Sequence, residues 1–472
     1  MLIGREEEQK RLLKLIDSEY SEFVAVYGRR RVGKTFLIRE TFQYRFTFQH
    51  AGIYQGKKPE QLKAFHNSIK DAGLKNISVP KTWLDAFEQL KDVIRQSTEK
   101  KKIIFIDELS WLDTPKSDLI MALESFWNGW ASARKDVVLI VCSSVTSWML
   151  NKVIHNKGGL YNRLTERIFL EPFSLKQCEE YVEKNGLIMT RYEIIETYMI
   201  LGGVPYYWKF LDKSLSLPQN IDRMFFAKNA ELKDEFAHLF SSLFRYPEEY
   251  IKIIHALATK NNGLTRSEII NATGISGSGS LSTKLEELEK CGFLRSYNAF
   301  GKRSKDSVFQ LIDPFTIFCI RFLSGKPKDG KFWINQLDTP KVNAWSGFAF
   351  ERVCFWHTEN IKKALGITGV LTDICSWSCK ADEDKGLFGS QIDMVIVRKD
   401  RVINLLEMKF SSAEYSIDKA TYESLMRKKS DFLRETGTRS SVHITMVTPF
   451  GISRNKYSGE IQSEITAEDL FD

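Results

Sequence analysis

Residues 28–35 read Gly28-Arg29-Arg30-Arg31-Val32-Gly33-Lys34-Thr35 and match the pattern G-x-x-x-x-G-K-[ST] at every fixed position. This pattern forms a turn whose backbone N–H groups point at phosphate oxygens, with its lysine on the β- and γ-phosphates and its last hydroxyl on Mg²⁺. An apolar run at 23–27 precedes the motif, and a helix-like run starts at Phe36. Strand, loop and helix in this order place phosphates at a helix N-terminus. A purely structural glycine turn is the alternative, but the context predicts a nucleoside triphosphate site that contacts Gly28, Arg31, Val32, Gly33, Lys34, Thr35 and Phe36.

The composition is that of an ordinary globular protein. The chain has 472 residues, too many for one core, and its length suggests roughly three or four domains. Hydrophobic residues make up 43% and charged residues 27%, so no large part need be disordered. The net charge of +8, from 68 basic and 60 acidic residues, permits nucleic acid as a partner without requiring it.

Several features point to the cytoplasm. No apolar run approaches membrane-spanning length, and residues 1–8 are too charged for a signal peptide. The seven cysteines are scattered, and the close pair Cys375 and Cys379 has no second pair beside it. We therefore expect free thiols in a reducing compartment rather than a zinc site, and no membrane partner.

A second apolar strand, at 102–107, ends in Asp107 and Glu108. Such a strand belongs to a parallel sheet, whose carboxyl edge holds ligands. We expect Asp107 to bind Mg²⁺ through water and Glu108 to polarise the attacking water. A third strand at 137–142 ends in Ser143-Ser144, which would either sense the γ-phosphate or cap the next helix.

Two arginines follow this strand. Arg163 or Arg167 could reach a γ-phosphate as an arginine finger, in cis or from another subunit, and a surface arginine is the alternative. We place Arg163 among the candidate catalytic residues.

Motifs in the first half of the chain share an order with a known family. They are 3–8, the P-loop with Tyr27, 106–108, 171–174 and Gly202-Gly203-Val204-Pro205. This order resembles the archaeal-type ATPase family of the AAA+/STAND group. The resemblance implies that ATP is the nucleotide, that Ile3 and Gly4 flank the adenine, and that 172–245 is a helical lid with Pro205 close to the nucleotide.

The middle of the chain changes character. Three helix-like runs, at 250–258, 267–273 and 280–290, precede two strand-like runs that flank a basic turn at 301–306. This is the layout of a winged helix. A DNA-reading role would place Ser278, Ser280, Ser282, Thr283 and Lys284 in the major groove, with Lys302, Arg303 and Lys305 on phosphates. Winged helices also serve as protein-contact modules, and three glutamates on the same helix would repel phosphates.

The C-terminal third predicts a further α/β pattern. A helix holds Glu351, a strand at 391–397 holds Asp393, and its hairpin partner holds Glu407 and Lys409. Two carboxylates on neighbouring strands can bind Mg²⁺ for phosphodiester hydrolysis, and the lysine can orient or deprotonate the water. Glu351 would add a metal ligand. The arrangement resembles the PD-(D/E)xK nucleases, although a domain that has lost its chemistry is the alternative.

The sequence thus predicts an α/β multidomain chain. Its parts are a P-loop parallel-sheet ATPase core at 1–171, a helical lid at 172–245, a winged helix at 246–325 and a restriction-endonuclease-like domain at 326–472. We expect an ATP-controlled, Mg²⁺-dependent protein that binds and cleaves DNA and forms a homo-oligomer with ATP. The alternative is a regulator that uses an inactive nuclease-like domain as a scaffold.

Overall fold

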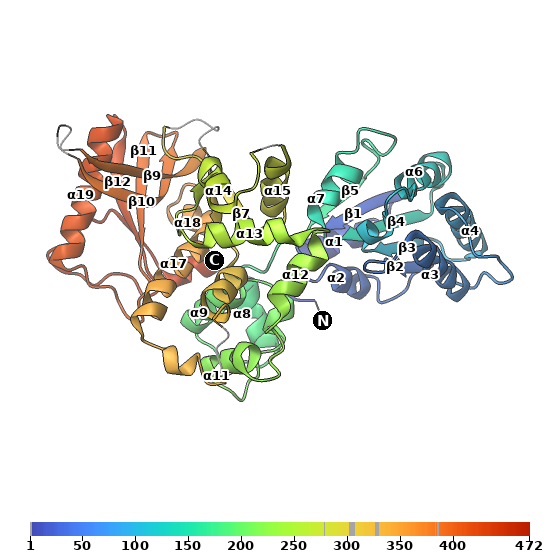
Figure 1. The fold of residues 1–472 in the computed structure, drawn as a ribbon, viewed down its shortest axis with the longest axis horizontal. Coiled ribbons are helices and arrows are strands. Elements are labelled where there is room, and N and C mark those ends of the chain that lie inside the picture. Colours follow the sequence, from blue (N-terminus) through green and yellow to red (C-terminus); the bar gives the residue numbers. More distant parts are fainter. Residues whose placement is uncertain (1, 278, 302–306, 326–329, 383, 385–386) are drawn as a thin grey trace. The chain divides into compact units, whose positions relative to one another are not determined.

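The computed structural model describes all of the chain except residues 1, 278, 302–306, 326–329, 383 and 385–386. The chain forms two compact units (Figure 1). The first unit comprises Met1–Pro172 with Leu239–Arg245, and the second comprises Phe173–His238 with Tyr246–Asp472. In the described part of the chain, no helix is both long and apolar enough to cross a lipid bilayer.

The first unit is built on a five-stranded sheet of order β2-β3-β4-β1-β5, in which every pair is parallel. Every residue of β4 is buried, as expected for a central strand covered on both faces. The strands are β1 (Glu22–Tyr27), β2 (Phe48–Ala51), β3 (Lys102–Asp107), β4 (Val137–Ser143) and β5 (Glu166–Phe169).

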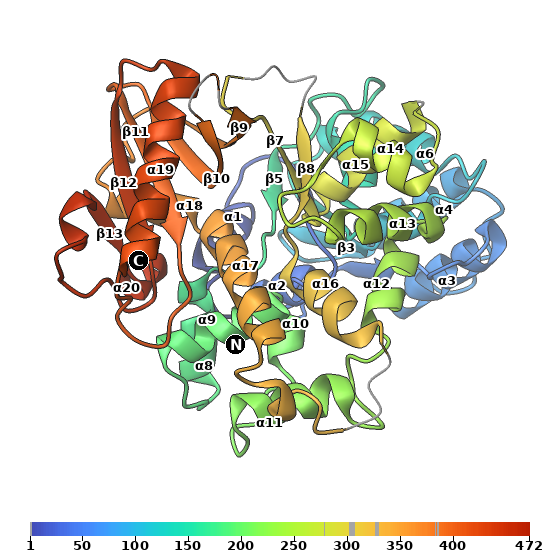
Figure 2. The ribbon, with the colours of Figure 1, turned by 60° about the vertical axis from the view of Figure 1, so that its left-hand side comes forward.

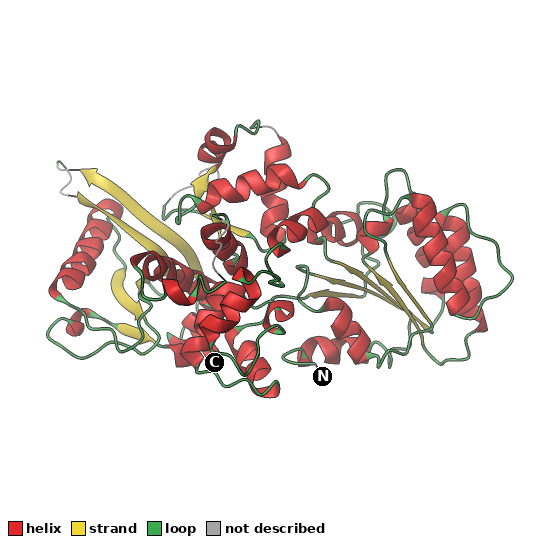
Figure 3. Ribbon diagram, turned by 60° about the horizontal axis from the view of Figure 1, so that its bottom comes forward, coloured by secondary structure: helices red, strands yellow, loops and turns green. Residues whose placement is uncertain are grey.

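Helices cover both faces of this sheet (Figure 3). One core joins the sheet to α1 and α2 through Leu12, Leu37 and Ile38, and the other joins it to α3, α4 and α6. The apolar residues of α4 recur at helical spacing, and Thr82 caps its first turn together with Asp85. The helices are α1 (Glu6–Lys14), α2 (Lys34–Thr41), α3 (Lys58–Asp71), α4 (Trp83–Gln96), α5 (Leu109–Leu112), α6 (Leu119–Gly129) and α7 (Thr146–Met149).

The second unit begins with a helical segment. Its helices are α8 (Leu175–Lys184), α9 (Arg191–Leu201), α10 (Pro205–Trp208), α11 (Leu217–Ile221) and α12 (Glu235–Leu243), the last of which runs into the first unit. Ser174 and Thr190 begin α8 and α9 with capping boxes. A Cβ on Gly203 would lie 1.9 Å from the carbonyl oxygen of Phe173, so the turn after α9 admits only glycine there.

A group of three helices and a small sheet follows. The helices are α13 (Pro247–Ala258), α14 (Arg266–Thr273) and α15 (Gly279–Lys290). The strands β6 (Leu264–Thr265), β7 (Leu294–Tyr297) and β8 (Val308–Leu311) form an antiparallel sheet of order β6-β8-β7. Leu281, Leu285 and Leu288 of α15 are buried, as their helical spacing predicts.

The last part is a five-stranded mixed sheet of order β13-β12-β11-β10-β9, with α19 lying along it (Figure 2). The strands β9 (Thr372–Asp382), β10 (Leu387–Arg398) and β11 (Val402–Met408) are antiparallel, whereas β12 (Ser441–Val447) and β13 (Ser463–Ile465) are parallel to β11. The helices are α16 (Pro314–Phe318), α17 (Pro340–Trp356), α18 (Thr358–Ala364), α19 (Lys419–Thr436) and α20 (Ala467–Phe471).

His357 ties α17 to the start of α8 within the second unit. Its Nδ1 lies 2.8 Å from the carbonyl oxygen of Val353, and its Nε2 lies 2.9 Å from the backbone nitrogen of Leu175. Because a carbonyl only accepts and an N–H only donates, the ring is neutral with its proton on Nδ1. Burial lowers the pKa of His357 to about 4.

Candidate functional site

The P-loop joins the end of β1 to α2 in a shape that glycine makes possible. Gly28 has φ 143° and Gly33 has φ 95°, and both values favour glycine. A Cβ on Gly28 would lie 2.3 Å from the carbonyl oxygen of Leu170. The Lys34 ammonium is buried and donates hydrogen bonds to the carbonyl oxygens of Gly28 and Arg29, each at 2.8 Å. The loop therefore wraps around its own lysine at the start of α2.

Thr35 and Asp107 meet at the carboxyl edge of the sheet. The Thr35 hydroxyl donates to Oδ2 of Asp107 at 2.7 Å, and Oδ1 of Asp107 accepts the backbone N–H of Glu108 at 2.9 Å. A hydroxyl and a carboxylate are the hard oxygen donors that Mg²⁺ prefers. These two residues fit a magnesium ion, which would reduce the charge on the nucleotide phosphates when bound.

Glu108 has an unusual backbone and a specific partner. Its φ of 47° and ψ of 48° lie in the left-handed region, which a glutamate rarely adopts. Its carboxylate accepts the backbone N–H of Ser144 at 3.0 Å and also a short hydrogen bond from the Ser144 hydroxyl. Ser144 thus holds the side chain that the sequence assigns to water activation.

The helix-cap interpretation of Ser143-Ser144 is wrong. In this described region, α7 begins without a side-chain capping hydrogen bond. The Ser143 hydroxyl instead donates to the Ser110 hydroxyl at 2.9 Å and accepts the N–H of Val145 at 3.1 Å.

The other predicted nucleotide residues are spread more widely. Gly4 is buried with φ 57°, Ile3 is half-buried, and the Arg5 side chain next to them donates to the carbonyl oxygen of Glu171 at 2.6 Å. Phe36 is 46% exposed on the first turn of α2. Arg31 has φ 73° in the loop, and Val32 is buried in the core with α1 and α2.

The remaining candidates of the ATP site stay predictions. Arg163 is exposed in the turn before β5, and Arg167 is exposed within β5. Pro205 is the first residue of α10 in the second unit. The contacts that we predict for these residues with a nucleotide remain untested.

The four C-terminal candidates come from three elements of the second unit. Glu351 lies on α17, Asp393 on β10, and Glu407 and Lys409 lie at the end of β11. The ladder between β10 and β11 ends at the pair Met394 and Leu406, and Asp393 and Glu407 are the next residues of the two strands. The fold thus brings the two strand carboxylates together.

Electrostatics show that Glu351 shares this environment. Burial, together with the charges of Asp393 and Glu407, raises the pKa of Glu351 to about 8, while the charges of Arg352 and Lys409 act against this shift. Burial alone would raise the pKa of Glu407, but Lys428 and Lys409 bring it below its ordinary value. One carboxyl therefore favours its neutral form while another favours its charged form.

Each carboxylate already has a protein partner. Glu351 pairs with Arg352 at 3.1 Å, and Oδ1 of Asp393 accepts from the Gln391 amide at 2.6 Å. Glu407 pairs with Lys409 at 2.9 Å and with Lys428 at 2.7 Å. Among the described residues, no group of three or more His, Cys, Asp or Glu side chains is close enough to hold a metal ion. The predicted ligands share one electrostatic environment, and their present partners are protein side chains.

Arg352, Gln391 and Lys428 were missed by the sequence analysis. Arg352 and Gln391 lie within two residues of a predicted ligand, so their proximity was available in the sequence. Lys428 reaches Glu407 from α19, and only the packing of that helix on the sheet brings it there.

The predicted DNA-reading helix is α15. Its Lys284 forms an ion pair with Glu249 of α13 at 2.9 Å, and the Ser282 hydroxyl accepts from Arg266 at 2.6 Å. Ser280 accepts a short hydrogen bond from Lys284, and Thr283 donates to the carbonyl oxygen of Gly279 at 3.1 Å. Ser278 and the basic-turn residues Lys302, Arg303 and Lys305 lie outside the described residues.

Comparisons with known proteins find one similar sequence and several similar structures. An uncharacterized protein of Methanocaldococcus jannaschii is 26% identical over 443 residues, which cover 91% of this chain and 92% of that protein. A Walker-type ATPase of Pyrococcus abyssi has a similar structure, with 18% identity and a TM-score of 0.49 over 68% of this chain and 96% of its own. The ORC2 protein of Aeropyrum pernix, in ADPNP–ADP complexes, gives 14% identity and a TM-score of 0.43 over 68% and 93%.

One family model matches the N-terminal part of the chain. Residues 2–211 match a family described as an ATPase domain predominantly from Archaea. The matched residues include the whole P-loop, Thr35, Asp107, Glu108 and Ser144. Residues 2–211 are therefore similar to an archaeal-type ATPase domain.

Proposed function

We propose that this chain is an ATP-hydrolysing switch protein that binds DNA and cleaves it with its C-terminal domain. The observation that carries the ATPase part is the 2.7 Å hydrogen bond between Thr35 and Asp107, which joins the P-loop to the end of β3. This hydrogen bond supports the proposal because it joins the two candidate magnesium ligands, and Asp107 is directly followed by Glu108.

The roles of the residues follow from this arrangement. The P-loop N–H groups and Lys34 bind the phosphate oxygens, and the lysine balances their charge. Glu108 orients the attacking water and accepts its proton, which requires the carboxylate to leave Ser144. Arg163, from this or another subunit, stabilises the charge that develops on the γ-phosphate.

Lys34→Ala tests the nucleotide assignment. The variant should lose ATP hydrolysis and most of its ATP affinity, because the substitution removes the ammonium that would balance the charge of the β- and γ-phosphates. Arg11→Ala is a matched control, since Arg11 lies in the same unit and pairs with Glu166 at the surface. Unchanged turnover in Lys34→Ala would overturn the assignment.

The nuclease part rests on the order and placement of the C-terminal elements. A helix carries Glu351, two antiparallel strands carry Asp393 and Glu407 next to their last paired residues, and Lys409 follows two residues after Glu407. A divalent cation there would supply an activated water and stabilise the leaving oxygen. Asp393 and Glu407 would hold the cation, and Lys409 would orient the water after it exchanges its ion pair with Glu407.

Cleavage assays with the full chain test this part. The wild type should cut DNA in the presence of ATP with Mg²⁺ or Mn²⁺, and Asp393→Ala and Lys409→Ala should abolish cutting while retaining ATP hydrolysis. Asp400→Ala is the matched control, because Asp400 is an exposed carboxylate that pairs with Arg398 near the same sheet. Equal cutting by Asp393→Ala and the wild type would assign the activity elsewhere.

A second function is a regulator with an inactive nuclease-like domain. The ion pairs of Glu407 with two lysines and of Glu351 with Arg352 favour this alternative, because they give the carboxylates partners other than a metal. A wild type that cuts neither DNA nor RNA under any of these conditions, yet hydrolyses ATP, would support the regulator.

DNA binding is proposed through α15. Fluorescence anisotropy with duplex DNA should show an affinity that falls steeply with salt, and Lys284→Ala should weaken it. Lys362→Ala is a control lysine that pairs with Glu359 on α18. No binding at low salt would exclude DNA as the partner.

A further inference from the structure

A cavity of about 600 Å³ lies within the second unit. Its walls come from the end of α13 and the loop after it, from Leu311 of β8, from 317–324 and from α17. The volume lies within the range of about 300–1,000 Å³ that is usual for small-molecule sites. The cavity can therefore accept a ligand of moderate size.

The charged side chains around this cavity are all basic. They are His255, Lys260, Arg321, Lys341 and Arg352, and no carboxylate is among the described residues that line it. Two of these cations form ion pairs with carboxylates that do not line the cavity. Lys260 pairs with Glu268 at 2.9 Å, and Arg352 pairs with Glu351 at 3.1 Å.

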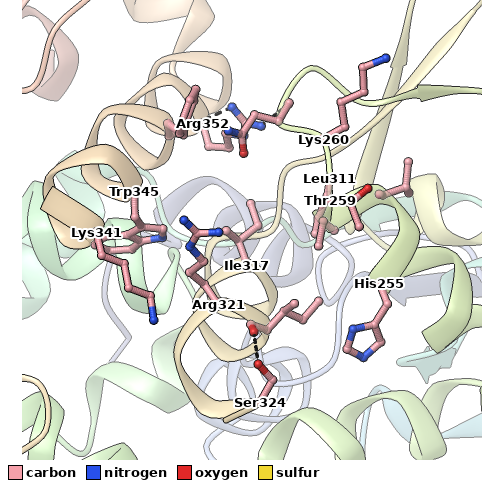
Figure 4. A pocket seen from close by; sticks show the side chains of 15 residues that line it. His255, Thr259, Lys260, Leu311, Ile317, Arg321, Ser324, Lys341, Trp345 and Arg352 are labelled. Atoms are coloured by element: carbon pink, nitrogen blue, oxygen red, sulfur yellow. Dashed lines mark hydrogen bonds between the residues drawn. The ribbon is translucent and has the colours of Figure 1, made fainter.

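Arg321 and Lys341 differ from these. Both are exposed, and within the described parts of the chain neither forms an ion pair, although the Lys341 ammonium lies 5.1 Å from the centre of the Phe322 ring. Figure 4 shows them beside Trp345 along one side of the cavity. Two neighbouring cations without an acidic partner are suited to bind a phosphate.

Trp345 adds an independent observation. The side chain is 5% exposed and lines the cavity, yet its indole N–H has no hydrogen-bond partner among the described residues. A buried donor of this kind normally has an acceptor, because a buried N–H without a hydrogen bond destabilises the fold. The indole packs edge-on against Phe322 and Trp333, with ring centres 5.4 and 5.6 Å apart, so the ring cannot turn freely toward another partner.

We propose that this cavity binds a nucleotide, distinct from the one at the P-loop. The phosphate would lie between Arg321 and Lys341, and the flat base would cover the apolar wall formed by Leu311, Ile317 and Trp345. A ring nitrogen or carbonyl oxygen of the base would accept the indole N–H. Arg352 would lie between the ligand and the predicted metal ligand Glu351, because it lines the cavity and pairs with Glu351.

Isothermal titration calorimetry on the full chain tests this site. All titrations use the Lys34→Ala background, which removes the P-loop as a competing site. The probes are the four 5′-ribonucleoside monophosphates and inorganic pyrophosphate. At least one monophosphate should bind saturably at one site, and Arg321→Ala and Lys341→Ala should each weaken binding by about tenfold or more.

The variants separate phosphate recognition from base recognition. Trp345→Phe, which keeps the ring but removes the donor, should weaken the nucleotide severalfold and leave pyrophosphate unchanged. Matched controls are Arg454→Ala, at a highly exposed arginine, and Lys456→Ala, whose ammonium lies 4.9 Å from the centre of the Tyr457 ring. Neither control should change the affinity.

Three results would overturn the proposal. The first is that no monophosphate binds saturably, and the second is that Arg321→Ala and Lys341→Ala leave the binding unchanged. The third is that pyrophosphate binds as tightly as the nucleotide. Circular dichroism melting of each variant shows whether it is folded, and Arg321, Lys341, Arg454 and Lys456 are on the surface.

Discussion

The carboxylate of Glu108 accepts a hydrogen bond from the backbone N–H of Ser144 at 3.0 Å and a second, short one from the Ser144 hydroxyl. The two residues directly follow neighbouring strands, β3 and β4, of the five-stranded parallel sheet. This pairing holds the proposed water-activating group on the protein.

Ser144→Ala removes one of the two hydrogen bonds that hold Glu108. Hydrogen bonds to charged groups contribute about 1.5–3 kcal/mol, so basal ATP hydrolysis should rise several-fold. Steady-state phosphate release measures the change, with Ser110→Ala as a control that alters a neighbouring hydroxyl pair instead. A fall in rate with unchanged ATP affinity would mean that Ser144 contacts the γ-phosphate rather than restraining Glu108.

Thr35→Ala removes the hydroxyl that joins the P-loop to Asp107. Because this hydroxyl is a proposed magnesium ligand, the Mg²⁺ concentration for half-maximal ATPase should rise about tenfold or more. Thr35→Ser keeps the hydroxyl and should stay near the wild type. The same magnesium dependence in all three proteins would remove Thr35 from the metal site.

The stability of the folded protein should depend on pH through the titration of His357. Its folded-state pKa is about 4, whereas the ordinary value is 6.5. Between these values the unfolded chain binds a proton that the folded chain does not, so stability falls as the pH drops from 6.5 toward 4. One unit of difference in pKa corresponds to about 1.4 kcal/mol, so the free energy of unfolding falls by at most about 3 kcal/mol.

Urea unfolding of wild type and His357→Gln between pH 4 and 7 measures this contribution. The variant should be less stable at pH 7 but should show a smaller loss on acidification. His238→Gln, at an exposed histidine of the same unit, is the control. An identical slope in His357→Gln and the wild type would contradict the neutral, buried state of the ring.

Gly203→Ala should destabilise the helical segment of the second unit. The new Cβ would lie 1.9 Å from the carbonyl oxygen of Phe173, whose N–H also donates to the Gly203 carbonyl at 2.6 Å. The backbone must move, and we expect a loss of at least about 2 kcal/mol. Gly369→Ala, where the Cβ meets nothing within 4 Å, should be nearly neutral in the same thermal melt.

Local patterns in the sequence predicted the elements of the ATPase domain well. The P-loop is contiguous, and the fully apolar strand at 137–142 appears as β4, which extends one residue further to Ser143. Parallel strands end at one edge of a sheet, which is why Thr35 and Asp107 could be placed together although 72 residues separate them.

Partners set by side-chain packing could not be predicted in this way. The sequence left Ser143-Ser144 as either sensor or cap, and the choice depends on where the Glu108 carboxylate points after its left-handed turn. Likewise, Lys428 lies on a helix 21 residues beyond Glu407, and its ion pair depends on how α19 crosses the sheet. Neither contact leaves a periodic signal in the chain.

Glu108→Gln gives the most direct test of the ATPase account. The variant keeps the shape of the side chain but cannot accept a proton, so it should bind ATP like the wild type and hydrolyse it at least about a hundredfold more slowly. ATP affinity and single-turnover hydrolysis, measured on the same preparation, give both quantities. Intact binding with lost hydrolysis is the predicted result, and hydrolysis at the wild-type rate would contradict the assignment of Glu108 and with it the proposed mechanism.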